Sequence, residues 1–349
     1  MPRKVKPQRI RLEASSICQL KCPSCPRVSG AIFSIIGNGF LRIGDFERLL
    51  DGNPWITEIE LSNYGEIFLN PDFVEIIRRA FERDVALTAD NGVNLNSVSN
   101  DILEALVKYG FRSMVCSIDG ASPETYKQYR INGDFRRVIK NIERINLLKK
   151  EYKSKHPRLG WQFVVFGHNE HEIPIARKLA GELSMEFRLK LSWDMNFSPV
   201  QDSEFVRKQV GVASRDEYIR RYGADYMQEI CHQLWEQPQI NWDGRILGCC
   251  RNFWGDFGGN AFSDGLLEGL NSEKITYARE MLTGKKAARE DIPCTTCSIY
   301  LHMEASGKWL NRSLLYRALR FANRKLGLHR YREQIIRAYH FRSLGDWGV

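Results

Sequence analysis

Long hydrophobic runs are missing from this sequence of 349 residues. The densest apolar stretch, Ala31–Ile36, is far shorter than the ~20 residues that a membrane-spanning helix needs. The first residues are basic but lead into no apolar core or small-residue cleavage site, so no signal peptide is expected. Repeats and low-complexity tracts are also absent, and 43% hydrophobic with 27% charged residues excludes a disordered chain or a collagen-like fibre. We therefore expect a globular, cytoplasmic enzyme.

Cysteine, in contrast, is well represented, with nine residues. Without an export signal the chain is expected in a reducing compartment, where disulfides are rare. A small disulfide scaffold is thereby excluded, and the cysteines are predicted to be metal ligands or buried thiols.

Positive charge is concentrated at the C-terminus. Residues 306–349 hold ten Lys or Arg and two Asp or Glu, so they carry +8 of the formal net charge of +9. Leu310, Leu314, Ala318 and Phe321 recur at helical spacing there, which predicts a basic amphipathic helical tail. The tail is expected to cover the body of the protein with a charged outer face; docking on an anionic membrane surface or another anionic partner is the alternative. No RNA-binding motif is present, so nucleic acid is not an expected partner.

Short apolar segments alternate with helical patterns through the first 200 residues. The expected strands are Arg9–Ala14, Glu58–Leu61, Val85–Thr88, Ser113–Ile118, Gly160–Phe166 and Phe187–Ser192. The expected helices between them include Ile43–Leu50, Asp72–Arg83, Asp101–Tyr109, Phe135–Lys149 and Glu172–Glu182. Six strand–helix repeats predict an α/β fold with a parallel sheet, a partial (β/α)6 barrel whose active site lies at the C-terminal strand ends.

Four segments are predicted along the chain. The partial barrel occupies residues 8–200, a polar helical connection 201–230, a small cysteine-rich domain 231–305, and the basic tail 306–349. The cysteine-rich segment has too little apolar periodicity to build a core alone, so we expect a metal centre to hold it together.

The strongest signal is Cys18-x3-Cys22-x2-Cys25, directly after the first expected strand. Three thiolates in so short a loop suit an iron–sulfur cluster, and three ligands on a four-iron cube leave one iron open to a small molecule. A tetrahedral zinc site would need a fourth ligand nearby, and a redox pair would not need Cys18.

This pattern resembles the signature of the radical S-adenosylmethionine (radical SAM) superfamily. Other segments match it: Asn63-Tyr64-Gly65-Glu66 after the second strand, Asn91-Gly92 after the third, and Ser117-Ile-Asp119-Gly120 with Arg130 after the fourth. The resemblance covers roughly residues 8–200. It implies a [4Fe–4S] cluster on Cys18, Cys22 and Cys25, bound SAM, and a reductant such as flavodoxin or ferredoxin.

The resemblance also implies the residues that contact SAM. They are Tyr64, Gly65, Glu66, Asn91, Ser117, Asp119 and Arg130. By charge, Glu66 suits the SAM ammonium, Arg130 its carboxylate and Asp119 a ribose hydroxyl. Tyr64 and Ile67 depart from the family's Gly-Gly-Glu-Pro stretch, which blurs the contacts assigned to this loop. Cys116, on the opposite face of the fourth strand, is expected to be a buried, inert thiol.

A second cysteine group follows the barrel, and it resembles the SPASM/Twitch auxiliary-cluster region of many radical SAM enzymes. Gly244-x4-Cys249 matches an element of the shorter Twitch form. The resemblance implies an auxiliary [4Fe–4S] cluster on Cys231, Cys249, Cys294 and Cys297. A four-cysteine zinc site is the alternative, although the spacing fits paired zinc knuckles poorly.

The adjacent Cys250 has three interpretations. It is the true auxiliary ligand in place of Cys249, a packed thiol, or a hydrogen-atom donor, as in radical SAM epimerases. The resemblance implies that SAM is cleaved to a 5′-deoxyadenosyl radical, which abstracts a hydrogen atom from the substrate. We expect epimerisation of a sugar-like carbinol centre. The alternatives are alcohol dehydrogenation and modification of a ribosomal peptide, and in each of these two reactions the auxiliary cluster would accept an electron. The peptide reaction is the less favoured alternative, because the first expected strand begins near residue 9 and leaves no N-terminal domain to bind a leader peptide.

A small-molecule or saccharide substrate is therefore expected. Carboxylates, amides and an indole near the first, fifth and sixth strands would suit a hydroxyl-rich ligand. These candidates are Glu13, Gln162, Trp193, Asp194 and Asn196.

Overall fold

The computed structural model describes residues 4–310. Within them, seven strands form one sheet in the order β6-β5-β4-β3-β2-β1-β7, and every neighbouring pair is parallel. The strands are β1 (Arg9–Leu12), β2 (Glu58–Glu60), β3 (Ala86–Val93), β4 (Ser113–Ser117), β5 (Arg158–Val165), β6 (Glu186–Leu191) and β7 (Gln239–Ile240). The predicted α/β fold, an open partial barrel, is thus confirmed.

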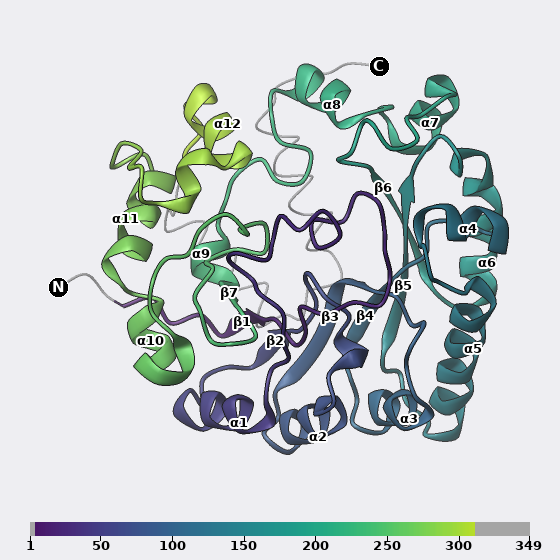
Figure 1. Ribbon diagram of the computed structural model, residues 1–349, viewed down its shortest axis with the longest axis horizontal. Helices are drawn as coiled ribbons and strands as arrows, with labels where there is room; N and C mark the ends of the chain where they lie inside the picture. The colour runs from purple at the N-terminus through teal and green to yellow at the C-terminus, as the bar shows by residue number, and fades with distance from the viewer. Residues whose placement is uncertain (1–3, 311–349) are drawn as a thin grey trace. The chain divides into compact units, whose positions relative to one another are not determined.

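Helices connect the first six strands. They are α1 (Ile43–Gly52), α2 (Phe73–Glu82), α3 (Asn100–Lys108), α4 (Pro123–Tyr129), α5 (Phe135–Glu151) and α6 (Ile173–Glu182). Figure 1 shows α1, α2, α3, α5 and α6 along the outer side of the curved sheet, while the purple N-terminal loop runs across its inner side. Apolar stripes fix this arrangement: α5, for example, buries Val138, Ile142, Ile145 and Leu148.

The two faces of the sheet differ in chemistry. The Phe187 ring on β6 contacts the rings of Trp161 and Phe163 on β5. The guanidinium of Arg177 on α6 lies over the Phe187 ring, so these aromatic side chains face the helices. Because side chains alternate along a strand, Gln162 and Lys190 face the inner side. The inner side also carries buried Glu60 of β2, which accepts a hydrogen bond from the Thr88 hydroxyl at 2.6 Å. The outer face therefore builds the core, and the polar inner face is available for chemistry.

The strand β7 was not among the expected elements. It pairs with β1 at the sheet edge, through Arg11 opposite Gln239 and Leu12 opposite Ile240. Two residues give no periodic signal, which is why the sequence did not reveal this strand. The cysteine-rich segment thus contributes directly to the barrel sheet, and residues Met1–Lys308 form one compact unit.

Six further α-helices follow β6 within the described part of the chain. They are α7 (Ser203–Val210), α8 (Arg215–Tyr222), α9 (Gln233–Glu236), α10 (Leu266–Gly269), α11 (Glu273–Leu282) and α12 (Ser298–Ser306). In residues 4–310, none of the helices has the length and apolar character needed to cross a membrane. The basic tail predicted at 306–349 lies, from residue 311 onward, outside the described residues.

Candidate functional site

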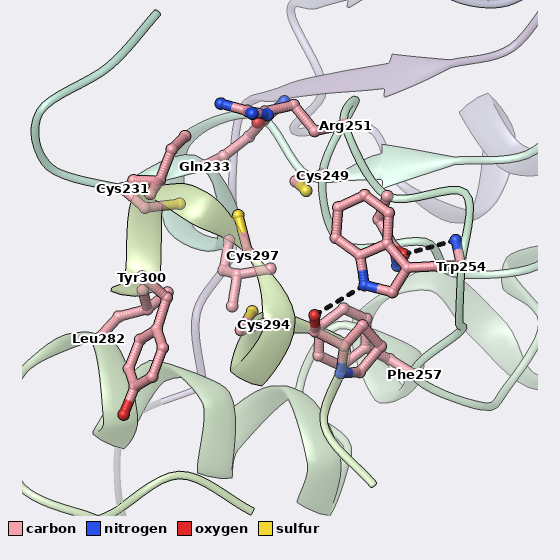
Figure 2. A pocket seen from close by; sticks show the side chains of 14 residues that line it. Cys231, Gln233, Cys249, Arg251, Trp254, Phe257, Leu282, Cys294, Cys297 and Tyr300 are labelled. Atoms are coloured by element: carbon pink, nitrogen blue, oxygen red, sulfur yellow. Dashed lines mark hydrogen bonds between the residues drawn. The ribbon is translucent and has the colours of Figure 1, made fainter. Parts of the chain in front are cut away.

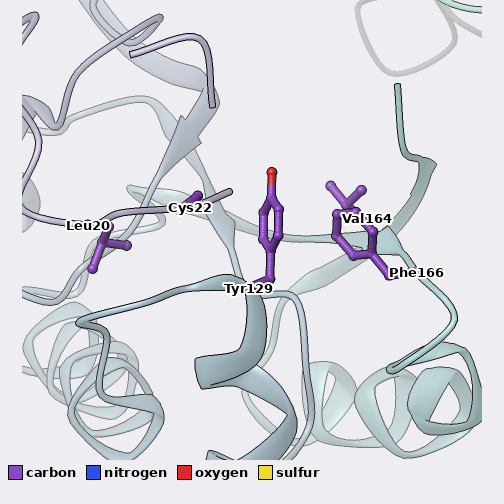
Figure 3. Packing of buried hydrophobic residues seen from close by; sticks show 5 residues of the cluster. All are labelled: Leu20, Cys22, Tyr129, Val164 and Phe166. Atoms are coloured by element: carbon purple, nitrogen blue, oxygen red, sulfur yellow. The ribbon is translucent and has the colours of Figure 1, made fainter. Parts of the chain in front are cut away.

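The first three cysteines lie in the loop after β1 and surround one apolar cluster. Cys22 is buried with Leu20, Tyr129, Val164 and Phe166, and the half-buried Cys18 and Cys25 pack against the same group. Figure 3 shows Leu20 and Cys22 on one side of the Tyr129 ring and Val164 with Phe166 on the other. Apolar surroundings limit the access of solvent to a metal centre and tune its potential. The cysteine loop therefore has the environment that an iron–sulfur cluster requires.

Only a few polar groups reach these thiols. The Asn94 amide donates to Cys18 Sγ at 3.8 Å, and the Arg130 guanidinium donates to Cys22 Sγ at 3.5 Å. Burial raises the pKa of Cys18 to about 12 and also raises the pKa of Cys22, although Arg130 opposes the latter shift. Asn94 directly follows β3 at its C-terminal end, where the parallel barrel predicts functional residues, and Arg130 caps the C-terminus of α4, the short helix after β4.

Glu66 lies next to the same loop. It is 2% exposed, and its carboxylate accepts hydrogen bonds from Asn94 N at 2.7 Å and Phe68 N at 3.3 Å. Burial raises its pKa to about 7, and nearby Arg130 opposes this shift. The Asn94 side chain accepts a hydrogen bond from Gln19 at 2.9 Å. Asn94 thus links the cysteine loop to Glu66, a role that the sequence did not reveal although its place after β3 is the same strand-end signal.

Asp119 and Arg130 form a buried ion pair. Two guanidinium nitrogens lie 2.5 and 2.6 Å from Asp119 Oδ2, while Oδ1 accepts a hydrogen bond from Val164 N at 2.7 Å. Asp119 is completely buried, so both of its oxygens are engaged within the protein. Asp119 thus positions Arg130, and its predicted contact with a SAM ribose hydroxyl stays a prediction.

The loop Tyr64–Glu66 is fixed against the end of β1. Glu13 Oε1 accepts hydrogen bonds from Tyr64 N at 2.9 Å and Gly65 N at 3.2 Å, and Glu66 N donates to Ile17 O at 2.8 Å. A Cβ on Gly65 would lie 2.1 Å from Ser15 O, so only glycine fits this position. Glu13, a predicted substrate contact, is completely buried, and its Oε1 holds this loop while its Oε2 has no hydrogen-bond partner among the described residues. Its contact with a substrate stays a prediction.

The remaining predicted SAM contacts lie near the same strand ends. Ser117 is buried at the end of β4, close to Gly92, whose Cβ would meet Ser117 Oγ at 2.6 Å. Asn91 is exposed and donates to Asn63 Oδ1 at 2.9 Å. Cys116 is completely buried, as predicted.

The second cysteine group borders a pocket of about 460 Å³ that includes space open to solvent. Figure 2 shows Cys231, Cys249, Cys294 and Cys297 around it. Trp254 and Phe257 lie on one side, and Leu282 and Tyr300 on the other. Burial raises the pKa values of the Cys231, Cys249 and Cys294 thiols.

The hairpin that carries Cys249 begins at β7. Asn241 N donates to Arg245 O at 2.9 Å, and Gly244 in the turn has a φ of +90° that favours glycine. Cys249 lines the four-cysteine pocket, but its neighbour Cys250 does not. Instead, Cys250 Sγ contacts Gln233 Oε1 at 3.7 Å. The cysteines that line the pocket are the predicted set Cys231, Cys249, Cys294 and Cys297, and their role as auxiliary-cluster ligands stays a prediction.

The four thiols line a pocket instead of converging on one point. Within residues 4–310, no three His, Cys, Asp or Glu side chains are placed to hold a single metal ion. A [4Fe–4S] cluster presents a separate iron to each of its four thiolates, so thiols spread around a cavity are compatible with the predicted auxiliary cluster.

Cys250 is instead connected to the loop after β2. Its carbonyl accepts hydrogen bonds from the Tyr64 hydroxyl at 2.9 Å and the Asn63 amide at 3.1 Å. The Tyr64 ring also packs edge-on against Phe253, with ring centroids 6.2 Å apart. These contacts join the second cysteine region to the loop after β2, although the two lie far apart in the sequence.

The other predicted substrate residues lie on β5 and in the loop after β6. Gln162 is half-buried on the inner face of β5 and accepts a hydrogen bond from Lys190 Nζ at 3.4 Å. Trp193 is 48% exposed, and its indole donates to Ser24 O at 3.3 Å. Asp194 accepts hydrogen bonds from the backbone of exposed Asn196 at 2.9 Å and of Phe197 at 3.2 Å. Asp194 therefore shapes its own loop, while Gln162 is the candidate that lies on the inner face.

Comparison with known proteins agrees with this geometry. Residues 12–175 match the model of the Radical SAM superfamily. A segment of 139 residues is 30% identical to the AdoMet-dependent heme synthase of Methanosarcina barkeri (strain Fusaro / DSM 804), and it spans 39% of this chain and 38% of that protein.

Solved structures show the same fold. SuiB of Streptococcus suis bound to S-adenosylmethionine has a TM-score of 0.58 at 16% identity, covering 84% of this chain and 71% of that one. Native anSMEcpe with bound AdoMet has a TM-score of 0.53 at 16% identity, covering 90% of this chain and 99% of that one.

Proposed function

We propose that this enzyme epimerises a carbinol centre of a sugar-like substrate. The premise is that residues 12–175 match the radical SAM superfamily, whose members use SAM and a [4Fe–4S] cluster. The proposal has three parts: a catalytic cluster on the first cysteine loop, an auxiliary cluster in the four-cysteine pocket, and Cys250 as the hydrogen-atom donor.

Cys18, Cys22 and Cys25 are proposed to hold the catalytic cluster. When bound, this cluster supplies the electron that cleaves SAM to methionine and a 5′-deoxyadenosyl radical. The apolar cluster around Tyr129 and Phe166 keeps water from the thiolates. The contacts of Asn94 with Cys18 and of Arg130 with Cys22 orient these sulfurs.

Two charged groups beside this loop suit the amino-acid end of SAM. Glu66 is proposed to accept from the ammonium and Arg130 to donate to the carboxylate, as charge-assisted hydrogen bonds. The Asp119 carboxylate keeps Arg130 in place, 14% exposed at its side chain. The amides of Tyr64 and Gly65 stay fixed by Glu13, so the loop does not need to reorganise when SAM binds.

The position of Cys250 carries the epimerisation proposal. Its sulfur is not part of the four-cysteine pocket lining, yet its carbonyl is held by Asn63 and Tyr64 of the loop assigned to SAM. Loss of a hydrogen atom from the substrate C–H bond to the 5′-deoxyadenosyl radical leaves a carbon radical. The Cys250 S–H bond then breaks and its hydrogen atom bonds to the opposite face of that carbon. One electron from the external reductant, such as flavodoxin or ferredoxin, and one proton from solvent restore the thiol.

The test is solvent deuterium incorporation. The reconstituted, reduced enzyme is incubated in D2O with SAM and a panel of sugars and sugar conjugates, and the products are analysed by mass spectrometry. Epimerisation exchanges one C–H for one C–D because the thiol proton equilibrates with solvent, so the product mass increases by one unit. The Cys250→Ala variant should still form 5′-deoxyadenosine but should lose this product.

Other outcomes separate the alternatives. A product lighter by two hydrogens, formed equally by Cys250→Ala, would replace epimerisation with alcohol dehydrogenation. Failure of the wild type to form 5′-deoxyadenosine under reducing conditions would refute the catalytic-cluster proposal itself.

A further inference from the structure

Lys190 is a cation on the inner face of the sheet that the proposed chemistry does not use. It lies near the C-terminal end of β6, and its ammonium contacts Gln162 Oε1 at 3.4 Å. Arg215, Cys250 and Asp119 all lie within electrostatic range of this ammonium. Lys190 is therefore near both the proposed hydrogen donor and Asp119 of the Asp119–Arg130 pair.

Arg215 brings a second positive charge to the same place. Its Nε donates to Leu191 O at 3.0 Å, which anchors the guanidinium to the residue next to Lys190. The guanidinium lies over the Tyr226 ring at 4.9 Å and the Trp193 ring at 5.8 Å. One of its terminal nitrogens is buried and has no hydrogen-bond partner among the described residues.

The acidic groups nearby are already paired. Asp225 binds Arg251 at 3.0 Å and the Ser298 hydroxyl at 2.7 Å, and Asp119 binds Arg130. Within residues 4–310, neither Lys190 nor Arg215 forms an ion pair. Two half-buried like charges with an unsatisfied guanidinium N–H are unfavourable unless an anion joins them. Guanidinium and ammonium groups are also the usual partners of phosphate and carboxylate.

We propose that Lys190 and Arg215 bind an anionic group of the substrate, a phosphate or a carboxylate, and so place the reacting carbon beside Cys250. This inference rests on the proposed function for its catalytic meaning, but the anion site itself is tested without turnover. The substrate class becomes a hydroxylated compound with one oxyanionic group, such as a sugar phosphate or a sugar acid. Gln162, which contacts Lys190, is left to bind a neighbouring hydroxyl.

The experiment measures protection of Lys190 from a neutral amine reagent. The full-length reconstituted enzyme is labelled by reductive methylation with formaldehyde and a cyanoborohydride reductant, and labelled peptides are quantified by mass spectrometry. The probes are inorganic phosphate, acetate and, as a neutral control, glycerol. Lys178, whose side chain is 80% exposed, serves as the internal control.

An anion at the site should slow labelling of Lys190 about tenfold when the probe is present at about ten times its Kd, and Lys178 should not change. Protection by phosphate alone identifies a phosphate site, and protection by acetate alone identifies a carboxylate site. Equal labelling with phosphate, acetate and glycerol would overturn the proposal. So would a Lys190 that the reagent never reaches, because a substrate could not reach it either.

A variant pair tests the second cation. Arg215→Gln should raise the phosphate or acetate concentration needed for protection about tenfold or more, as expected for loss of one charge-assisted hydrogen bond. Arg207→Gln, which removes an exposed arginine paired with Glu217, should leave protection unchanged. Equal protection in both folded variants would remove Arg215 from the site. Formation of 5′-deoxyadenosine without substrate is measured in parallel, so that failure of the proposed function is seen separately.

Discussion

The hydroxyl of Tyr64 donates a 2.9 Å hydrogen bond to the carbonyl of Cys250. Tyr64 belongs to the loop assigned to SAM, and Cys250 follows the cysteine assigned to the auxiliary cluster. The loop is itself held by Glu13 on the first strand. Together with the Asn63 bond to the same carbonyl, this bond couples the geometry of the proposed SAM loop to that of the proposed hydrogen donor.

Removing this bond should cost stability. Tyr64→Phe keeps the ring contact with Phe253 but leaves the Cys250 carbonyl with Asn63 alone. We expect a loss of about 1 kcal/mol in the free energy of unfolding, measured by anaerobic denaturation. Tyr277→Phe, which removes an exposed 3.3 Å bond to Ala287 O, is the matched control and should lose less. Equal losses would mean that the Tyr64–Cys250 hydrogen bond contributes no more to the free energy of unfolding than the exposed Tyr277–Ala287 bond does.

Gly65 should not tolerate a side chain. Gly65→Ala would place its Cβ 2.1 Å from Ser15 O, which forces the loop away from β1. We expect a loss of more than about 2 kcal/mol in the free energy of unfolding, within the range for overpacking. Gly181→Ala is the control, because Gly181 is helical and has no atom within 4 Å of the added Cβ; it should be neutral or stabilising. A stable Gly65→Ala variant with normal SAM binding would contradict the observed packing.

Stability should depend on pH through Glu13. Burial raises its pKa from 4.5 to about 8, so between these values the folded protein retains a proton that the unfolded chain has lost. The stability contribution of this group is full below pH 4.5 and is lost as the pH rises to about 8. The Glu13→Gln variant stays neutral, so its stability relative to the wild type should increase from pH 5 to pH 8. A constant difference across this range would show that Glu13 does not titrate there.

The two adjacent cysteines should differ in iron content. Cys249→Ala is expected to lose the auxiliary cluster, which lowers the iron content from about eight to about four per chain. Cys250→Ala is the matched control and should retain all the iron, because its sulfur does not line the pocket. The reverse result would make Cys250 the ligand and remove it as a hydrogen donor.

The first cysteine loop is tested in the same assay. Replacing Cys18, Cys22 and Cys25 with Ala should lower the iron content from about eight to about four and abolish 5′-deoxyadenosine formation. A fall from about four to zero would assign the second site to zinc or to no metal.

The local sequence determined much of this protein. Strand–helix alternation predicted the six main strands, since burial of an apolar strand and an amphipathic helix leaves a periodic pattern wherever the segment lies. The spacing of Cys18, Cys22 and Cys25 likewise predicted a catalytic cluster, because thiolates that hold one cluster can be supplied by one short loop. Both signals lie within segments of a few residues.

Tertiary structure decided the contacts between distant segments. It separated Cys249 from Cys250, paired Asp119 with Arg130, buried Glu13 beneath the Tyr64 loop, and brought Arg215 beside Lys190. None of these relations has a local pattern, because each depends on which side chains two remote elements place opposite each other. The sequence thus determined the fold and the class of chemistry, whereas the partner of each charged or thiol group was decided only when the chain closed around them.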